Sequence, residues 1–321
     1  METTRYTIKE SGWKKFARQG GVLLCLLAIC VFFTIISPHF FNERNLISVV
    51  LQASINIIVA LGMTVVIITG GIDLSVGPIL AVCGVVLAQM LVNGTNAFLA
   101  VLAALALGVL MGLINGSLIS VFNLQPFLVT LGTMSIYRGL ALVYTTGKPV
   151  PGVPDSYTSV IGGKIGIIPV PVIIMIAIVL LVYCLLKFTK IGVYIFAIGG
   201  NVEAAKLSGI NVTKYKMTAY VISGLACALG AVVMVGRLGA AEPTAATGYE
   251  LDAIAASAIG GASLAGGKGS VIGTVLGALI LAVLKNGMTL LNVQSYYQQI
   301  ATGIVIILAV MLDHFTNSTK K

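Results

Sequence analysis

Apolar residues along this chain are gathered in long runs, and short segments between the runs hold most of the charged residues. A helix needs about 20 apolar residues to cross the hydrocarbon core of a bilayer. The element at 251–264 is too short to cross fully, so we expect a broken or re-entrant helix there. The runs predict ten helical elements, at residues 20–36, 46–69, 75–93, 97–121, 127–145, 169–187, 216–237, 251–264, 271–290 and 296–312.

Composition indicates that lipid is the solvent for much of the chain. Of the 321 residues, 58% are hydrophobic and 9% are charged, and the mean hydropathy is +1.05. Soluble domains carry roughly 25% charged residues, so a soluble fold of this length could not bury so much apolar surface. We therefore predict an all-α integral membrane protein with about ten transmembrane or broken helices, forming a single transmembrane domain over residues 1–321.

The distribution of basic residues predicts the orientation. Cytoplasmic segments of membrane proteins carry an excess of Lys and Arg, which here places the tail 1–19, the loop 188–215 and both termini in the cytoplasm. The loops 146–168 and 238–250 are then periplasmic, and the first of these reads as irregular because it is rich in Pro and Gly. The net charge of +9 reflects this orientation, since no basic face interleaved with aromatic residues indicates nucleic-acid binding.

A weak internal repeat links two parts of the chain. Residues 70–77 (Gly-Gly-Ile-Asp-Leu-Ser-Val-Gly) resemble residues 260–267 (Gly-Gly-Ala-Ser-Leu-Ala-Gly-Gly), although the spacing to later matching residues differs between the halves. Those later residues are Asn115-Gly116 and Asn123-Leu124-Gln125 in the first half, and Asn286-Gly287 and Asn292-Val293-Gln294 in the second. Transporters often contain such duplications, with paired broken helices at the substrate route. The candidate route residues are Asn56, Gly70, Gly71, Asp73, Asn115, Gly260 and Gly261.

Several polar residues in or near the runs have two interpretations each. Asp73 can line a route, because burying an acid at membrane depth costs free energy and such residues usually serve a function. It can instead cap the helix at 75–93, which is the interpretation we favour. Arg138 can take part in conduction or extend to the outer interface, and we favour the interface. The amides Asn56, Asn115, Asn123 and Gln125 can bind a solute, but helix packing is the better interpretation for most of them.

The loop 188–215 predicts a short helix over residues 202–208. Asn201 is a favourable N-cap, Glu203 lies in the first turn, and Gly209 can end the helix. Two interpretations stand on these residues alone. The helix either rests on lipid headgroups at the cytoplasmic surface or docks onto another protein.

Residues Glu203-Ala-Ala-Lys-Leu-Ser-Gly209 resemble the E-A-A-x-x-x-G loop of the ABC-importer permeases. Residues 70–77, 199–201, 207–211, 243–256 and 260–269 resemble the ribose-type sugar branch of that family, and the resemblance extends from about Ser37 to Asp313. It implies a multi-pass subunit of a bacterial inner membrane in which the loop seats a coupling helix in the ATP-hydrolysing subunit. The residues that carry this expected role are Asn201, Glu203, Ala204, Ala205 and Gly209.

The resemblance also implies the partners. They are a cytoplasmic ATP-binding subunit, a periplasmic sugar-binding protein, a second permease copy and membrane lipid, with no cofactor and no metal. Ribose is the expected sugar, although relatives also carry allose, galactose, xylose and other small saccharides. The charged residues expected to face the binding protein are Arg237, Glu242, Glu250 and Asp252, because complementary charges steer docking.

Two other classes of protein compete with this reading. An ion-coupled secondary transporter of a small polar solute would show a similar repeat, but it needs an ion or proton site, for which Asp73 is the only well-placed acid. An integral-membrane enzyme needs a reactive group, and the sequence shows no P-loop, no metal-ligand spacing and no nucleophile paired with a base. We therefore expect a transport subunit and not an enzyme.

Overall fold

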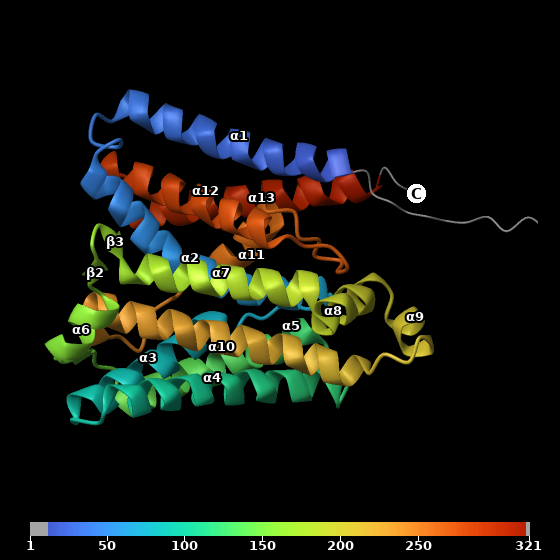
Figure 1. Cartoon of the computed structure of the whole chain (residues 1–321), viewed down its shortest axis with the longest axis horizontal. Coiled ribbons are helices and arrows are strands. Elements are labelled where there is room, and N and C mark those ends of the chain that lie inside the picture. Colours follow the sequence, from blue (N-terminus) through green and yellow to red (C-terminus); the bar gives the residue numbers. More distant parts are fainter. Residues whose placement is uncertain (1–11, 319–321) are drawn as a thin grey trace, which may run out of the picture.

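A computed structural model shows a chain that is helical over most of its length (Figure 1). It describes the backbone of residues 12–318 and the side-chain surroundings of residues 20–308 and Met311. Each of the ten predicted elements coincides with a helix, although α1 begins at Gly12, eight residues before the predicted start; residues 1–11 of the predicted tail lie outside the described residues. The helices are α1 (Gly12–Ile36), α2 (Glu43–Ile68), α3 (Val76–Val92), α4 (Ala97–Ser120), α5 (Pro126–Thr145), α7 (Val170–Phe188), α10 (Val212–Leu238), α11 (Tyr249–Ile259), α12 (Val271–Leu290) and α13 (Ser295–Ser318).

Short elements mark the two ends of the bundle (Figure 1). One end, called the strand end below, carries α6 (Asp155–Ile161) and two antiparallel strand pairs. The strands are β1 (Val150–Pro151) with β4 (Ala240–Ala241), and β2 (Lys164–Ile165) with β3 (Ile168–Pro169). The loop expected to be irregular at 146–168 therefore contains a helix and strands. The opposite end, called the α9 end, carries α8 (Lys190–Gly200) and α9 (Val202–Leu207), and the described ends of α1 and α13 lie there too.

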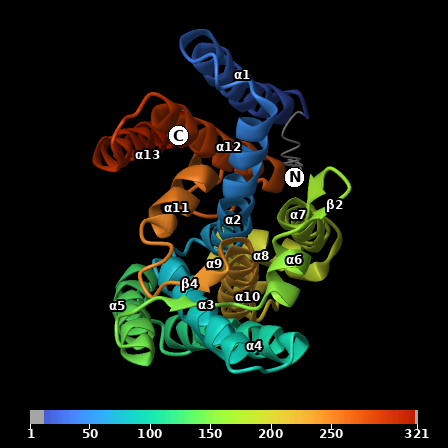
Figure 2. The same ribbon diagram turned by 90° about the vertical axis from the view of Figure 1, so that its left-hand side faces the viewer.

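The described residues contain six helices that are long and apolar enough to cross a membrane, namely α2, α4, α5, α7, α10 and α12. Their burial differs strongly. In the most apolar stretch of α2 and α10, 83% and 78% of the residues are buried, against 28%, 22% and 28% in α4, α5 and α7. Figure 2 shows α2 and α10 in the middle of the bundle. A helix that is apolar on all sides can be buried or face lipid, so α2 and α10 form the core and the others cover it.

Close packing of α4 on α10 depends on glycines. A Cβ atom added at Gly108, Gly112 or Gly116 would overlap the main chain of α10, at Gly224, Tyr220 and Met217 respectively. The glycine spacing on α4 thus allows the two helices to approach through their backbones, as small residues do in membrane bundles.

The two halves of the chain contain a similar group of packed helices, and the short helices α3 and α11 run toward opposite ends of the bundle (Figure 1). Helix α3 packs on α4, α5 and α10, and α11 packs in the same way on α12, α13 and α2. Asn123 and Asn292, which follow α4 and α12, both have a left-handed backbone, with φ of 54° and 57°. The predicted match between these later residues therefore agrees with the fold, but that between 70–77 and 260–267 does not, because they join different helix pairs, α2 to α3 and α11 to α12.

Candidate functional site

Two short helices begin inside the bundle after a stretch of irregular chain. Residues 69–75, called the first break, connect α2 to α3, and residues 242–248, called the second break, connect β4 to α11. Helix α11 has 11 residues, which span roughly 16 Å at about 1.5 Å per residue, far less than a bilayer core of about 30 Å. A short helix is thus present where 251–264 was predicted, but it begins two residues earlier and ends five residues earlier, at Ile259.

The first turns of α3 and α11 touch each other. A Cβ atom at Gly77 would lie 2.5 Å from the Ala246 carbonyl oxygen and 2.6 Å from Oε2 of Glu250. The first break leaves α2 at the α9 end, and the second break comes from β4 at the strand end. Paired half-helices whose N-termini meet within the bundle are the arrangement that transporters use at their substrate sites.

Asp73 is the centre of the first break and is fully buried. Its Oδ1 accepts hydrogen bonds from the backbone N–H of Ser75 at 3.0 Å and from the Ser75 hydroxyl at 2.6 Å. Its Oδ2 accepts a hydrogen bond of 2.9 Å from the Ser223 hydroxyl on α10. Ser75, not Asp73, is the N-cap residue of α3. Asp73 instead accepts bonds from Ser75 within a local turn and from Ser223 of another helix.

A chain of hydrogen bonds extends this network to α4 and α5. The Asn115 amide donates to the Ser75 hydroxyl at 2.7 Å, and the Tyr137 hydroxyl donates to the Met111 carbonyl oxygen at 3.2 Å. Tyr137 also lies 3.4 Å from Asn115 Oδ1. Asn115 therefore joins the hydrogen-bond network of Asp73, and the role of both residues on a route stays a prediction.

Arg138 holds the second break in place. Its Nη1 donates to the carbonyl oxygens of Pro243 at 2.7 Å and Ala245 at 2.8 Å. The guanidinium is bonded to the main chain of the second break, so Arg138 makes a structural contact between α5 and this segment, and its position relative to the outer interface stays a prediction.

Two of the four residues expected to face a binding protein are buried instead. Glu250 and Asp252 are 8% and 5% exposed, because the chain re-enters the bundle after β4 and carries the first turn of α11 inside. Asp252 forms an ion pair of 2.5 Å with Lys285 of α12, and Oε1 of Glu250 accepts from the Gly248 N–H at 3.2 Å. Neither acid is available to a partner at the strand end.

Among the other expected route residues, Asn56 has a buried Oδ1 that forms no hydrogen bond within the described part of the chain. The same holds for two atoms outside that expected set, Tyr220 Oη and Glu250 Oε2. A Cβ atom at Gly71 would overlap the Tyr220 hydroxyl, so Gly71 belongs to the first break and its surroundings. Gly260, by contrast, ends α11 in close contact with the backbone of Gly273, and Gly261 follows it with a φ of 90°, outside the second break.

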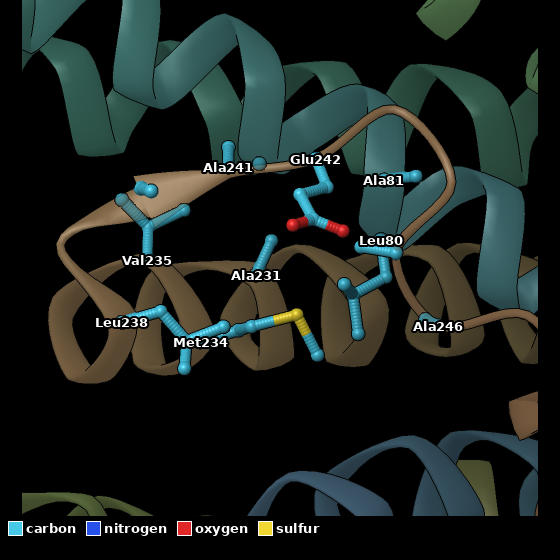
Figure 3. Close-up of a pocket in the computed structure, with 12 residues that line it drawn as sticks. Leu80, Ala81, Ala231, Met234, Val235, Leu238, Ala241, Glu242 and Ala246 are labelled. Carbon is cyan, nitrogen blue, oxygen red and sulfur yellow. The ribbon is translucent and has the colours of Figure 1, made fainter. Parts of the chain in front are cut away.

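The strand end contains a cavity of about 240 Å³ between α3, α10 and the segment around β4 (Figure 3). Alanine and other apolar side chains form most of its wall, and Glu242 is its charged residue. Glu242 is exposed, whereas Arg237 is half-buried and donates to the Leu51 carbonyl oxygen at 3.4 Å. Of the four expected docking residues, Glu242 is thus the one presented to solvent.

The loop at the α9 end contains the predicted short helix, α9, which ends one residue before the predicted 208. It is otherwise more helical than predicted, because α8 precedes α9 and α10 begins at Val212. Asn201 caps α9, because its Oδ1 accepts from the Ala204 N–H at 2.9 Å, and Gly209 follows the helix with a φ of 78°. Glu203 and Ala204 are exposed, Glu203 forms an ion pair of 2.9 Å with Lys206, and Ala205 is buried against the protein. The apolar Leu207 is 90% exposed on the same short helix.

Comparison with known proteins assigns the chain to a family. Residues 45–310 match the family described as "Branched-chain amino acid transport system / permease component". The chain belongs to this permease family. It is 47% identical over 306 residues to the ribose import permease protein of Escherichia coli (strain K12), a match that covers 94% of this chain and 95% of the relative.

Two further relatives agree. The ribose import permease protein of Bacillus subtilis (strain 168) is 44% identical over 296 residues, covering 91% of this chain and 92% of the relative. The D-allose transport system permease protein of Escherichia coli (strain K12) is 38% identical over 303 residues, covering 94% of this chain and 92% of the relative. No solved structure matches the chain. The predicted membership of the permeases is confirmed, and the protein is a multi-pass transport subunit of the inner membrane.

Several residues of the permease site were not expected from the sequence. Ser223, Tyr220 and Lys285 lie inside apolar runs, where a single polar residue usually contacts a neighbouring helix, and this was the only signal available. Leu207 is exposed at the α9 end, but a single apolar residue is ordinary on a protein surface, so no local pattern marked it in advance. Among the described residues no group of three or more His, Cys, Asp or Glu is placed to hold a metal ion.

Proposed function

We propose that this permease is the membrane-spanning subunit of an ATP-driven importer that takes a small sugar, ribose first, from a periplasmic binding protein. The relatives named for ribose import match nearly the whole chain at 44–47% identity, and the one named for allose is less similar at 38%. The single observation that carries the proposal is this match over nearly the whole chain. The capped, exposed helix α9 supports it.

Helix α9 is the proposed contact with the ATP-binding subunit. Glu203 and Ala204 are exposed and Leu207 is 90% exposed, so the helix presents an apolar side chain beside a charge, a composition that suits a protein groove. The buried Ala205 anchors its other side. In this proposal the α9 end faces the cytoplasm, the ten helices cross or enter the membrane, and both termini are cytoplasmic.

The sugar route is proposed to pass the meeting point of the two breaks. Buried polar atoms without a hydrogen bond among the described residues lie there, Tyr220 Oη against Gly71 and Glu250 Oε2 against Gly77. Such groups, and Asn56 Oδ1 on α2, can form hydrogen bonds with sugar hydroxyls. Binding at the route is expected to be weak, since selection belongs to the binding protein. Glu242 at the strand end is the proposed docking charge for that protein.

A second copy of the permease completes the proposed assembly. On α5, Gly132 and Gly139 have open space around their Cα atoms, and Ser135 is exposed. Small residues on an exposed face allow the close approach of another membrane helix. An ion-coupled carrier remains the alternative function, but Asp73, its best candidate for an ion site, already receives three hydrogen bonds from protein groups.

The test is reconstitution with the cognate ATP-binding subunit and binding protein, followed by uptake of labelled ribose, allose, galactose and xylose. Ribose is expected to enter fastest and only with ATP. A preference for another sugar would refute the ribose assignment, and uptake without ATP would refute the importer.

A pair of variants tests the docking role of α9. Leu207→Asp and Glu203→Lys are expected to prevent co-purification of the ATP-binding subunit while the permease still inserts. Ile167→Asp is a matched control, because Ile167 is 87% exposed at the opposite, strand end. Normal co-purification and uptake by both α9 variants would show that the subunit docks elsewhere.

A further inference from the structure

Three segments meet through their backbones at the α9 end, without intervening side chains. The Gly267 N–H donates to the Ile68 carbonyl oxygen at 2.9 Å. A Cβ atom at Gly199 would overlap that same carbonyl oxygen and lie 2.5 Å from the Gly267 nitrogen. This contact, called the Gly199 joint, therefore accepts no residue larger than glycine at position 199 without displacing the chain.

The joint connects the segments that lead to both breaks. Ile68 is the last residue of α2, directly before the first break. Gly267 lies in the connection between α11 and α12. This connection follows the C-terminal end of α11, and the second break precedes its N-terminal end. A Cβ atom at Gly266 would lie 2.8 Å from the Gly199 carbonyl oxygen and 3.0 Å from the Gly70 nitrogen, which brings the first break itself into the contact.

The third segment is α8, which continues directly into α9. The Asn201 N–H donates to the Ala197 carbonyl oxygen at 3.1 Å, while the Asn201 side chain caps α9. Asn201 therefore both ends α8 and starts α9, so one residue separates the two helices. Such a short connection is suited to passing a displacement of α9 to α8 and then to the joint.

Backbone contact makes this joint suited to transmitting movement. Side chains at an interface can change rotamer and absorb a shift, but packed main-chain atoms cannot, since protein interiors are close-packed and resist compression. Elements packed in this way switch between discrete arrangements and do not deform continuously. A movement of α8 must therefore move the end of α2 and the 260–270 connection with it.

We propose that the Gly199 joint transmits movement of α9 to both breaks, with Gly199 as a positioning residue that couples ATP hydrolysis to opening of the route. This inference rests on the proposed function of α9 as the docking site for the ATP-binding subunit. It assigns a separate role to a residue that does not itself dock. Docking and coupling should therefore be separable by mutation.

The first test compares two neighbouring glycines of α8. Gly199→Ala is expected to retain the ATP-binding subunit and its ATPase activity but to lose about tenfold or more in sugar transported per ATP hydrolysed, a coupling loss in the usual range. Gly200→Ala is the matched control, because no atom lies within 4 Å of a Cβ added there. Equal coupling in both variants would overturn the proposal.

A second variant covers the case in which Gly199→Ala fails to fold. Insertion of two glycines between the exposed Gly200 and Asn201 leaves the joint and α9 intact but separates them. Uptake per ATP is expected to fall while the ATP-binding subunit still co-purifies. Wild-type coupling in this insertion would overturn the proposal, whereas failure of the wild-type permease to bind the ATP-binding subunit would refute the docking function, and the joint with it.

Discussion

The two breaks, each taken with the first turn of the helix that follows it, are stabilised in different ways. In the first break, both oxygens of Asp73 accept hydrogen bonds from neutral groups, the Ser75 N–H and two serine hydroxyls. At the second break the stabilising groups are charged: Arg138 on α5 donates to main-chain oxygens of the break, and Lys285 on α12 pairs with Asp252 in the first turn of α11. The same turn leaves Oε2 of Glu250 without a hydrogen bond in the described structure.

This difference teaches which break depends on a single charged side chain of an outer helix. The first break is bonded by neighbours in sequence, by the central helix α10, and by neutral groups of the outer helices, Asn115 on α4 and Thr130 on α5. The second break instead receives charge-assisted bonds from one side chain, Arg138 of α5. Removing that side chain should therefore loosen the second break more than the first.

The largest expected effect comes from the ion pair between α11 and α12. Lys285→Met leaves the buried Asp252 without a countercharge, and removing one partner of a buried pair typically costs 3–5 kcal/mol. Because 32% of the Lys285 side chain is exposed, we expect a loss of about 3 kcal/mol, measured by thermal unfolding in detergent. The double variant Lys285→Met, Asp252→Asn should recover most of this stability; a single variant as stable as the wild type would show that the pair contributes nothing.

The next effect concerns Arg138. Arg138→Gln removes two charge-assisted hydrogen bonds to the second break, each kind of bond being worth about 1.5–3 kcal/mol. Hydrogen exchange at the Ala245 and Tyr249 amides, which bond within this loop, should accelerate by roughly thirtyfold for about 2 kcal/mol. The Ser75 amide in the first break serves as the internal control. Equal acceleration in both breaks would contradict the distinction between them.

A smaller effect is expected at Asp73. Asp73→Asn keeps an oxygen for Ser75, and the Ser223 hydroxyl can turn to accept from the new amide, so the loss should be about 1 kcal/mol. We expect a lower folded yield with normal transport by each molecule that folds. Asp73→Ala, which keeps none of these bonds, should lower the yield further. Normal accumulation of Asp73→Asn without transport would show that Asp73 is a route residue.

The smallest effect separates two buried tyrosines. Tyr137→Phe removes hydroxyl bonds to Met111 and Asn115 and should cost about 1 kcal/mol. Tyr220→Phe removes a hydroxyl that has no hydrogen bond among the described residues, so unfolding should be nearly unchanged. A slower sugar uptake in Tyr220→Phe alone would place its hydroxyl on the route. Equal destabilisation by both changes would contradict the description of the first network.

The positions of the long apolar helices could be predicted from the sequence, because apolar runs of sufficient length leave a membrane chain few alternatives. The α9 helix was also predictable, since Asn201 and Gly209 act locally. The direction of the chain after β4 was not, so Glu250 and Asp252 were expected on an outer surface. The buried Asp252 is paired with Lys285, 33 residues further along, and no local pattern encodes such a contact.

The alignment of the repeat shows the same limit. Asn123 and Asn292 are recognisable because a left-handed turn selects for asparagine. The glycine-rich segments 70–77 and 260–267 look alike for another reason. Both contribute to the backbone contacts at the α9 end, where Gly266 approaches Gly70, so they are neighbours in space and not equivalent positions in the two halves.

The most direct test of the account is uptake of labelled ribose by the permease reconstituted with its ATP-binding subunit and binding protein, with and without ATP, for the wild type and Leu207→Asp. The account predicts ribose uptake only with ATP, and its loss in the variant. Uptake that proceeds without ATP, or that follows an ion gradient and is unaffected by Leu207→Asp, would contradict it.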